Sequence, residues 1–348
     1  MRYVIKRLLL LIPTLLLILL TNFAIVHVAP TGPVETQLAK IASEQHALNQ
    51  QGFLIAQQVR YQGKDGLSDE MIDELHARFG FDKPAHERFW LMLKNYATFE
   101  LGQSFFQGQS VASLLAQKLP ISLAFGGLSL LVMYGAGVLL GVLKARFDGS
   151  LFDKLTALLL ATVYALPVFL VALVLMMLFA GSRFWHVFPM QVVFAENFGQ
   201  LPWYEQLTVA VYQLTLPVIA SSLSGVASIA YLSKFGVLAE FCQPYVLAAK
   251  ARGLTIGQII YGHVIKNALM AVVAQMPMVV VGVLFAGNFL VEVIFGIDGL
   301  GRLGFEAVLS HDYPVMFGVL YVFTLISLLT QLLFDGLYCL LDPRISYH

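Results

Sequence analysis

Residues 119–143 read LPISLAFGGLSLLVMYGAGVLLGVL and contain no charged side chain. An α-helix rises 1.5 Å per residue and the hydrocarbon core of a bilayer is about 30 Å thick, so about 20 apolar residues can cross it. The segment is long enough for one crossing and too short for two. We therefore predict a membrane-spanning helix here.

Five further stretches lack charged residues over a similar length, at 8–34, 155–182, 206–233, 267–291 and 313–334. Each can hold one span and none can hold two. Some contain prolines that mark either bends around a translocation path or ordinary packing kinks: Pro13, Pro167, Pro217 and Pro277. The sequence thus predicts an all-α polytopic membrane protein with six transmembrane helices.

The composition agrees with this prediction. Of the 348 residues, 12% are charged and 58% are hydrophobic, whereas soluble domains have about 25% charged residues. The formal net charge is +0, so no basic field indicates nucleic-acid binding. These values exclude a disordered chain and favour a protein whose surplus apolar surface faces lipid.

The orientation follows from the positive charges, because short loops rich in Lys and Arg stay in the cytoplasm. The chain ends and two of the loops carry most of them: Arg2, Lys6, Arg7, Lys144, Arg146, Lys154, Lys234, Lys250, Arg252, Lys266 and Arg344. The short loops on the other side hold only Arg183 and Arg302. We therefore expect both termini to be cytoplasmic, with residues 1–34 forming the N-terminus and first span and residues 342–348 forming a tail.

Residues 35–118 differ in composition from the rest, with ten Asp/Glu and eight Lys/Arg. Ser68 and Gly80 are suitable end residues for one helix, and Pro84 suits the first turn of a second. We predict a small helical insert on the outer, periplasmic side. Residues 119–341 are then a core of five spans, with a cytoplasmic loop at 234–268.

The sequence offers little support for chemistry within this chain. Residues 299–304 fit the dinucleotide motif G-x-G-x-x-G, but that site needs a preceding strand and here a predicted span precedes it. We interpret Gly299 and Gly301 as positions of a tight outer turn. With no P-loop motif, metal-ligand cluster or catalytic pair in the sequence, we expect neither an enzyme nor a bound metal or cofactor.

The predicted spans hold no charged residue, whereas ion-coupled carriers usually keep such groups at membrane depth. Any driving energy should therefore enter from elsewhere. Uncharged polar residues in the spans are candidates to contact a translocated molecule: Asn22, Tyr134, Tyr164, Gln213, Ser224, Ser228, Gln275 and Asn288. Hydrogen bonding between helices is the alternative role for such groups.

The loop between the fourth and fifth predicted spans reads YVLAAKARGL at 245–254 and HVIKNAL at 263–269. Alanine favours a short helix, and Gly253 suits its end. One interpretation is a basic connector that lies on anionic lipid. The other is a docking surface, because the small alanine side chains let another protein approach closely.

This loop resembles the "EAA" loop of ABC-importer permeases. Ala248, Ala249 and Gly253 match the two alanines and the glycine of that motif, and Leu247 stands in place of its glutamate. Other matches extend over nearly the whole chain: KRLLLLIPT at 6–14, FDKP at 81–84, EVIF at 292–295, GLG at 299–301, DYP at 312–314 and DPR at 342–344.

The chain is accordingly identified as a member of the dipeptide/oligopeptide family of binding-protein-dependent permeases. The long insert at 35–66 and Asp298, where most dipeptide permeases have proline, favour the branch linked to microcin C and other oligopeptides. The resemblance implies a bacterial inner-membrane location and import of peptides.

The resemblance also implies partners: a second homologous permease, two ATPase subunits or domains that bind ATP and Mg, and a periplasmic peptide-binding protein. It assigns the ATPase contact to a coupling helix and its end: Tyr245, Ala248, Ala249, Lys250, Arg252, Gly253 and Leu254. A stand-alone secondary carrier or channel is the alternative, and it predicts inverted internal repeats in the sequence. An intramembrane enzyme ranks last, because no nucleophile–base pair is visible in the spans.

Overall fold

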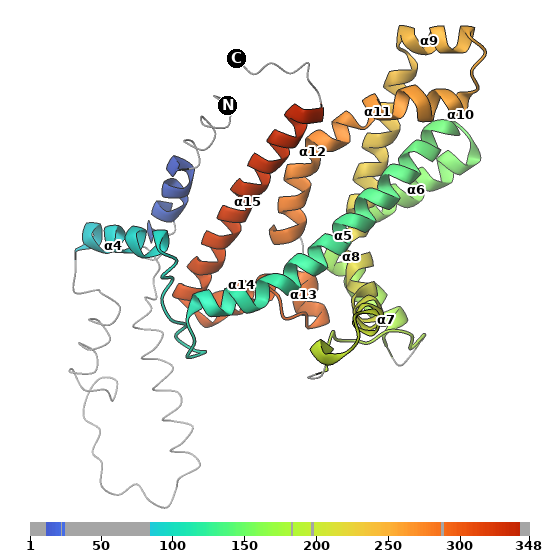
Figure 1. Cartoon of the computed structure of the whole chain (residues 1–348). Helices are drawn as coiled ribbons and strands as arrows, with labels where there is room; N and C mark the ends of the chain where they lie inside the picture. Colours follow the sequence, from blue (N-terminus) through green and yellow to red (C-terminus); the bar gives the residue numbers. More distant parts are fainter. Residues whose placement is uncertain are drawn as a thin grey trace, which may run out of the picture. The chain divides into compact units, whose positions relative to one another are not determined.

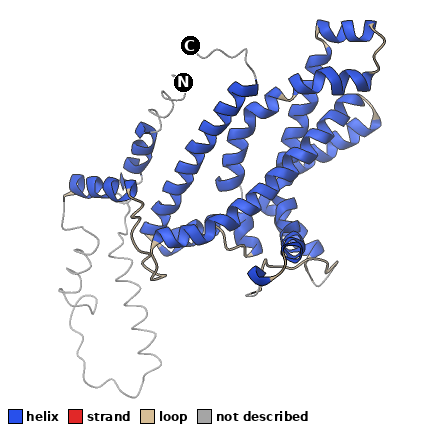
Figure 2. Ribbon diagram, in the orientation of Figure 1, coloured by secondary structure: helices blue, strands red, loops and turns tan. Residues whose placement is uncertain are grey.

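The computed structural model describes residues 12–21, 23–24, 84–181, 184–195, 198–286 and 289–341. These residues are mostly helical (Figure 2), and among them the one strand-like pairing joins Gln103 and Ser110. The all-α class predicted from the sequence is therefore confirmed for this part of the chain. The helix predicted between Ser68 and Gly80 lies outside the described residues, as does the tail 342–348.

The main helices follow one another along the chain as in Figure 1: α4 (Ala85–Ala97), α5 (Val111–Arg146), α6 (Leu151–Ala165), α7 (Val168–Phe179), η1 (Phe198–Gln200), α8 (Trp203–Phe241), α9 (Pro244–Ala251), α10 (Ile256–Ile259), η2 (Ile260–Val264), α11 (Ile265–Ala268), α12 (Met270–Val281), η3 (Gly282–Ala286), α13 (Phe289–Phe295), α14 (Leu300–Ser310) and α15 (Tyr313–Leu341). Of these, η2 and η3 are π-helical turns.

Four helical segments are long and apolar enough to cross a membrane: Val111–Arg146, Trp203–Phe241, Met270–Phe295 and Tyr313–Phe334. The pair α6 and α7 makes a fifth if it is counted as one span. The first predicted span is described only as the shorter apolar helix Ile12–Thr21. The chain is thus a multi-pass membrane protein, while the predicted total of six spans is not confirmed by the described helices.

The third predicted span, at 155–182, is broken into two helices. The axes of α6 and α7 differ by 106°. Leu166, between them, is extended with φ −85° and ψ 133°, because the ring of a following proline disfavours the helical conformation. Pro167 then caps α7, so this proline lies at a bend, which is compatible with both interpretations made from the sequence. Pro217 and Pro277, in contrast, remain inside α8 and α12.

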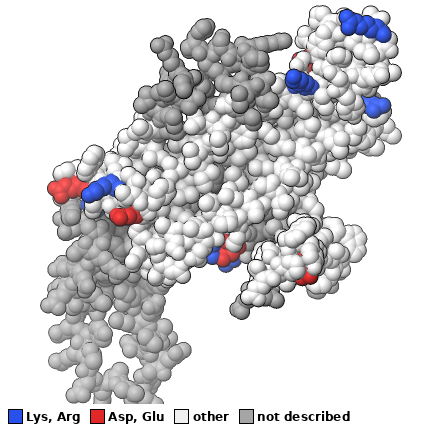
Figure 3. All heavy atoms as spheres, viewed as in Figure 1, with Lys and Arg blue, Asp and Glu red and all other residues white. Residues whose placement is uncertain are grey.

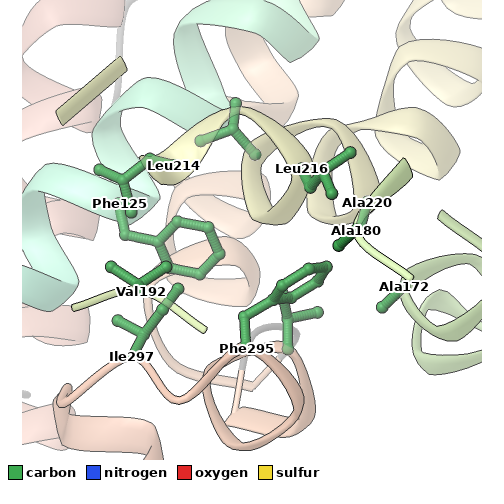
Figure 4. Packing of buried hydrophobic residues seen from close by; sticks show 11 residues of the cluster. Phe125, Ala172, Ala180, Val192, Leu214, Leu216, Ala220, Phe295 and Ile297 are labelled. Atoms are coloured by element: carbon green, nitrogen blue, oxygen red, sulfur yellow. The ribbon is translucent and has the colours of Figure 1, made fainter. Parts of the chain in front are cut away.

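The chain divides into two compact units, one of residues 1–4, 116–305 and 325–348 and one of residues 5–115 and 306–324. In the first unit, α6 and α7 both pack along α8 (Figure 1). Phe125 of α5 and Phe295 of α13 point into a core that they share with Leu214 and Leu216 of α8 (Figure 4). Because lipid is as apolar as these side chains, close packing stabilises such a core within a membrane.

Two glycines let α5 approach α8 closely. Gly137 and Gly141 form a G-x-x-x-G pair in α5, a spacing that places both on one face of a helix. A Cβ on Gly141 would lie 2.5 Å from the carbonyl oxygen of Ala230 and 2.5 Å from Cβ of Ser233. The backbones of the two helices therefore touch here, with no space for a methyl group.

Gly141→Ala is expected to destabilise the protein by about 1–3 kcal/mol, because the added methyl group meets backbone that cannot move alone. Gly135→Ala is the matched control in the same helix, since no atom lies within 4 Å of a Cβ there. In open helical surroundings alanine stabilises relative to glycine by roughly 0.5–1 kcal/mol. Thermal unfolding of the purified protein should therefore move in opposite directions for the two variants, and equal shifts would contradict the close approach.

In the second unit, α4 begins after Pro84, as predicted. Tyr321 of α15 stacks on Tyr96 of α4, with ring centroids 5.0 Å apart, and its hydroxyl donates to the carbonyl oxygen of Tyr96 at 3.0 Å. The loop that follows α4 is held by the buried carboxylate of Asp312. Its two oxygens accept from the hydroxyl of Ser104 at 2.5 Å and from the backbone N–H of Phe105 at 3.3 Å.

Candidate functional site

The short helix predicted in the loop at 234–268 is α9, which begins with Pro244 at its first position. Val246 and Ala249 are its buried residues. They pack in one cluster with Val142 of α5 and Val237 of α8. One face of α9 is therefore buried in a cluster that extends to the ends of two long helices, and α9 also contacts α10.

The opposite face of α9 is open. Leu247, which replaces the glutamate of the EAA motif, is 62% exposed. Three residues of the predicted ATPase contact, Ala248, Lys250 and Arg252, are exposed too, and so is Ala251 between them. Ala249, also predicted for that contact, faces the bundle instead. On the face drawn in Figure 3, Lys and Arg gather near α9 and α10, and the middle of the surface is uncharged.

Tyr245, the first residue of the predicted contact, is half-buried at the start of α9. Its hydroxyl donates to the carboxylate of Glu240 at the end of α8. Burial and this carboxylate raise the pKa of Tyr245 above its usual value. The phenol therefore stays protonated and ties the start of α9 to α8.

The end of α9 is closed by a Schellman motif. Gly253 has φ +82°, and its N–H donates to the carbonyl oxygen of Lys250 at 2.9 Å. The N–H of Leu254 reaches the carbonyl oxygen of Ala249 at 3.3 Å. Glycine is required here because other residues rarely adopt a positive φ.

A capping box follows directly after that turn. Thr255 and Gln258 cap each other's backbone at the start of α10, which satisfies two otherwise orphan N–H groups. The turn between α9 and α10 is therefore held by hydrogen bonds at both of its ends.

A cavity of about 420 Å³ lies beside the middle of α8. Its lining combines Ser221, Ser224 and Ser228 of α8 with Tyr164 near the end of α6 and apolar side chains such as Met133. The volume is within the roughly 300–1,000 Å³ of small-ligand sites. Gly282, in the π-helical turn η3, also lines it, and such turns often occur at functional sites.

Three of the eight predicted path residues, Tyr164, Ser224 and Ser228, thus meet at this cavity. Ser221 belongs with them and was missed, although its spacing of three and seven residues from the other two serines places it on the same helix face. It also forms a hydrogen bond with Ser129 of α5, at 2.7 Å between the two hydroxyl oxygens.

The other predicted path residues that the structure describes do not line the cavity. The side-chain amide of Gln213 donates to the carbonyl oxygen of Val193 at 3.1 Å and accepts from its N–H at 3.4 Å. Gln275 lies exposed on α12. Tyr134 packs between helices in another cluster. Asn22 and Asn288 are outside the described residues.

Gly299 and Gly301, predicted as turn residues, lie against a buried carboxylate. A Cβ on Gly299 would be 2.6 Å from Oε1 of Glu292, and a Cβ on Gly301 would be 2.9 Å from Oε2. The positive φ in this segment belongs to Gly296 instead. The two glycines are therefore explained by the close approach of Glu292 rather than by turn geometry.

Glu292 is only 2% exposed and organises the start of α14. It accepts from the hydroxyl of Ser122 at 2.9 Å and from the N–H of Arg302 at 2.8 Å. The Ser122 oxygen in turn accepts from the N–H of Leu300 at 2.8 Å. Two residues from α5 and α13 thus satisfy N–H groups of the first turn of α14, which have no partner within their own helix.

Comparisons with known proteins agree with this architecture. The family model described as "Binding-protein-dependent transport system inner membrane component" matches residues 137–347. The chain is 41% identical to the inner membrane ABC transporter permease protein YejB of Escherichia coli O157:H7, over 99% of this chain and 98% of that protein. It is 40% identical to the peptidoglycan transport system permease protein YejB of Agrobacterium fabrum, over 99% and 98%.

The dipeptide transport system permease protein DppB of Escherichia coli K12 is 29% identical, over 100% of this chain and 99% of that protein. Among solved structures, an inward-facing MetNI methionine ABC transporter matches with a TM-score of 0.50 and 16% identity, over 66% of this chain and 96% of that chain. That structure supports the fold alone. By its family match and its whole-length relatives, the chain belongs to the binding-protein-dependent transport system inner membrane component family and is a permease subunit of an ABC transporter.

Proposed function

We propose that this chain and a second, homologous permease form the membrane path of an ATP-driven importer for peptides. The observation that carries the proposal is α9, a rigid helix with one face packed on the bundle and Leu247 and its neighbours exposed on the other. An ATPase subunit that binds ATP and Mg docks on this exposed face. A periplasmic binding protein delivers the cargo on the outer side.

The proposed topology has six spans and cytoplasmic termini in the bacterial inner membrane. The insert at 35–118 lies on the periplasmic side, and the loop at 234–268 lies in the cytoplasm. The distribution of Lys and Arg supports this orientation. The short helix Ile12–Thr21 supports a span within 8–34.

ATP acts in this proposal by favouring one of two packings of the helices. When ATP draws the two ATPases together, α9 follows its ATPase as a rigid body and the bundle changes from inward-open to outward-open. A ligand can shift such an equilibrium only through contacts that differ between the two states. The exposed face of α9 supplies those contacts.

Peptides suit the cavity on α8. Ser224, Ser228 and Tyr164 offer hydroxyl groups to a peptide backbone, and Met133 and Val168 offer apolar contacts to side chains. The relatives named for dipeptide and peptidoglycan transport extend the proposed cargo to oligopeptides, microcin C-like peptides and the peptides of peptidoglycan fragments.

The first test is purification from native membranes in a mild detergent, with all associated chains identified by mass spectrometry. We expect a second permease together with one or two P-loop ATPases. The isolated complex, in liposomes and supplied with its periplasmic binding protein, should import labelled alanine dipeptide, tripeptide or pentapeptide, or a disaccharide-peptide from peptidoglycan, only when ATP is supplied. Recovery of this chain alone, still transporting without ATP, would overturn the proposal in favour of a secondary carrier.

A further inference from the structure

A buried carboxylate joins the cytoplasmic ends of three helices in the first unit. Asp153, in the first turn of α6, lies 2.9 Å from Nζ of Lys144 at the end of α5 and 2.7 Å from Nζ of Lys234 near the end of α8. The exposed fractions of these side chains are 9%, 0% and 12%. The positive loop charges expected from the sequence thus include two that are withdrawn from water.

Such withdrawal is costly unless further bonds satisfy the charges, and here they are present. Lys144 also donates to the carbonyl oxygen of Asp153 at 2.8 Å and to the hydroxyl of Thr156 at 2.9 Å. The N–H of Gly149 donates to Asp153 at 3.2 Å. Asp148, which is 52% exposed, adds a second negative charge 2.8 Å from Lys234, so the cluster is balanced.

The same turns of α5 and α8 belong to the buried cluster that contains α9. Val142 and Ala145, on either side of Lys144, are in one cluster with Val246 and Ala249 of α9, and so is Val237, one turn beyond Lys234. The cluster also contains Ile259 of α10, the helix that α9 contacts. Packed side chains pass a displacement to their neighbours because the interior has little free space. A shift of α9 can therefore reach the turns that carry the two lysines through this cluster.

From the lysines the connection continues into α6. Besides Asp153, α6 is tied to α8 by the hydroxyl of Tyr231, which donates to the carbonyl oxygen of Ala157 at 2.9 Å. Tyr164, two turns further along α6, lines the cavity. The ion pairs thus stand between the cytoplasmic loop and the cavity wall.

We propose that Lys144, Asp153 and Lys234 form a joint that transmits the displacement of α9 to α6 and to the cavity. They act as positioning residues, because none of them lines the cavity or lies in α9. This inference rests on the proposed function, since it assumes that an ATPase moves α9. It adds the step by which that motion changes the cargo site.

The test uses the complex purified with its ATPases, placed in liposomes and supplied with its periplasmic binding protein. ATP hydrolysis is measured together with import of the alanine peptide that the unmodified complex transports. Asp153→Asn keeps the shape of the side chain and removes its charge. We expect ATP hydrolysis to stay within about twofold of the unmodified complex, and peptide imported per ATP to fall roughly tenfold. A loss confined to folding would lower both activities together and leave their ratio unchanged.

Asp148→Asn is the matched control, because Asp148 also pairs with Lys234 but is exposed. The peptide imported per ATP by this variant should change less than about twofold. If Asp153→Asn fails to assemble, a triple variant takes its place: Lys144→Met, Asp153→Asn, Lys234→Met. This variant leaves no buried charge unpaired. The proposed joint would be contradicted if an assembled variant imported as much peptide per ATP as the unmodified complex. It would also be contradicted if both variants failed to assemble. The absence of ATP-dependent import by the unmodified complex would instead overturn the proposed function.

Discussion

Replacing Gly253 by valine is expected to reduce peptide import by roughly five- to 150-fold while the protein still inserts into the membrane and assembles. The turn that Gly253 forms has φ +82°, and holding a residue other than glycine in such a conformation costs about 1–3 kcal/mol. Because each 1.4 kcal/mol corresponds to tenfold in an equilibrium, this range gives the expected loss. Import into liposomes and the yield of assembled complex are the two measurements.

The cause of this loss is conformational rather than steric. No atom of the described residues lies within 4 Å of a Cβ on Gly253, so an added Cβ meets no neighbour there. To relieve the strain, the chain must give up the two hydrogen bonds that close α9, from Gly253 to Lys250 and from Leu254 to Ala249. The last turn of α9 then loses its fixed position, and with it the exposed side chains proposed to meet the ATPase.

Gly257→Val provides the matched control in the same loop. Gly257 also has no atom within 4 Å of a Cβ, but its φ is not positive. Valine there adds the same bulk without the same strain. Import close to normal in Gly257→Val and lost in Gly253→Val would support the backbone explanation, whereas equal losses would show that added bulk alone blocks docking.

The coupling loop shows how far local sequence can predict structure. Helix ends depend on neighbouring residues, so Gly253 could be identified as the end of α9 from its type and place. Which face of that helix meets the bundle depends on distant residues such as Val142 and Val237. Ala248 and Ala249 are chemically alike, and only the fold distinguishes the exposed one from the buried one.

The same limit explains the pairings that sequence reasoning missed. The absence of charge located the apolar stretches, but it carries no information about which helices touch. Asp153 and Lys234 are 81 residues apart, and Ser122 and Glu292 are 170 apart. Lys144 and Lys234 were interpreted as loop charges because the orientation rule counts lysines without regard to burial. The Gly137–Gly141 spacing, by contrast, is a local signal that could have indicated the contact between α5 and α8.

Replacing Glu292 by alanine is expected to have the largest effect on stability, about 2–6 kcal/mol, because two buried donors lose their acceptor. The change leaves the N–H of Arg302 and the hydroxyl of Ser122 without their acceptor. Each unsatisfied buried donor costs about 1–3 kcal/mol, and the first turn of α14 loses its cap. The midpoint of thermal unfolding of the purified complex should fall accordingly.

Two further variants make this prediction specific. Glu292→Gln retains one acceptor oxygen and nearly the same volume, so we expect it to lose less stability than Glu292→Ala. Glu306→Ala, at an exposed position of α14, should change stability by no more than about 0.5 kcal/mol. If the alanine and glutamine variants of Glu292 were equally stable, the carboxylate would not be capping α14. The crowding of Gly299 and Gly301 against it would then need another explanation, because a Cβ at either position lies within 3 Å of that side chain.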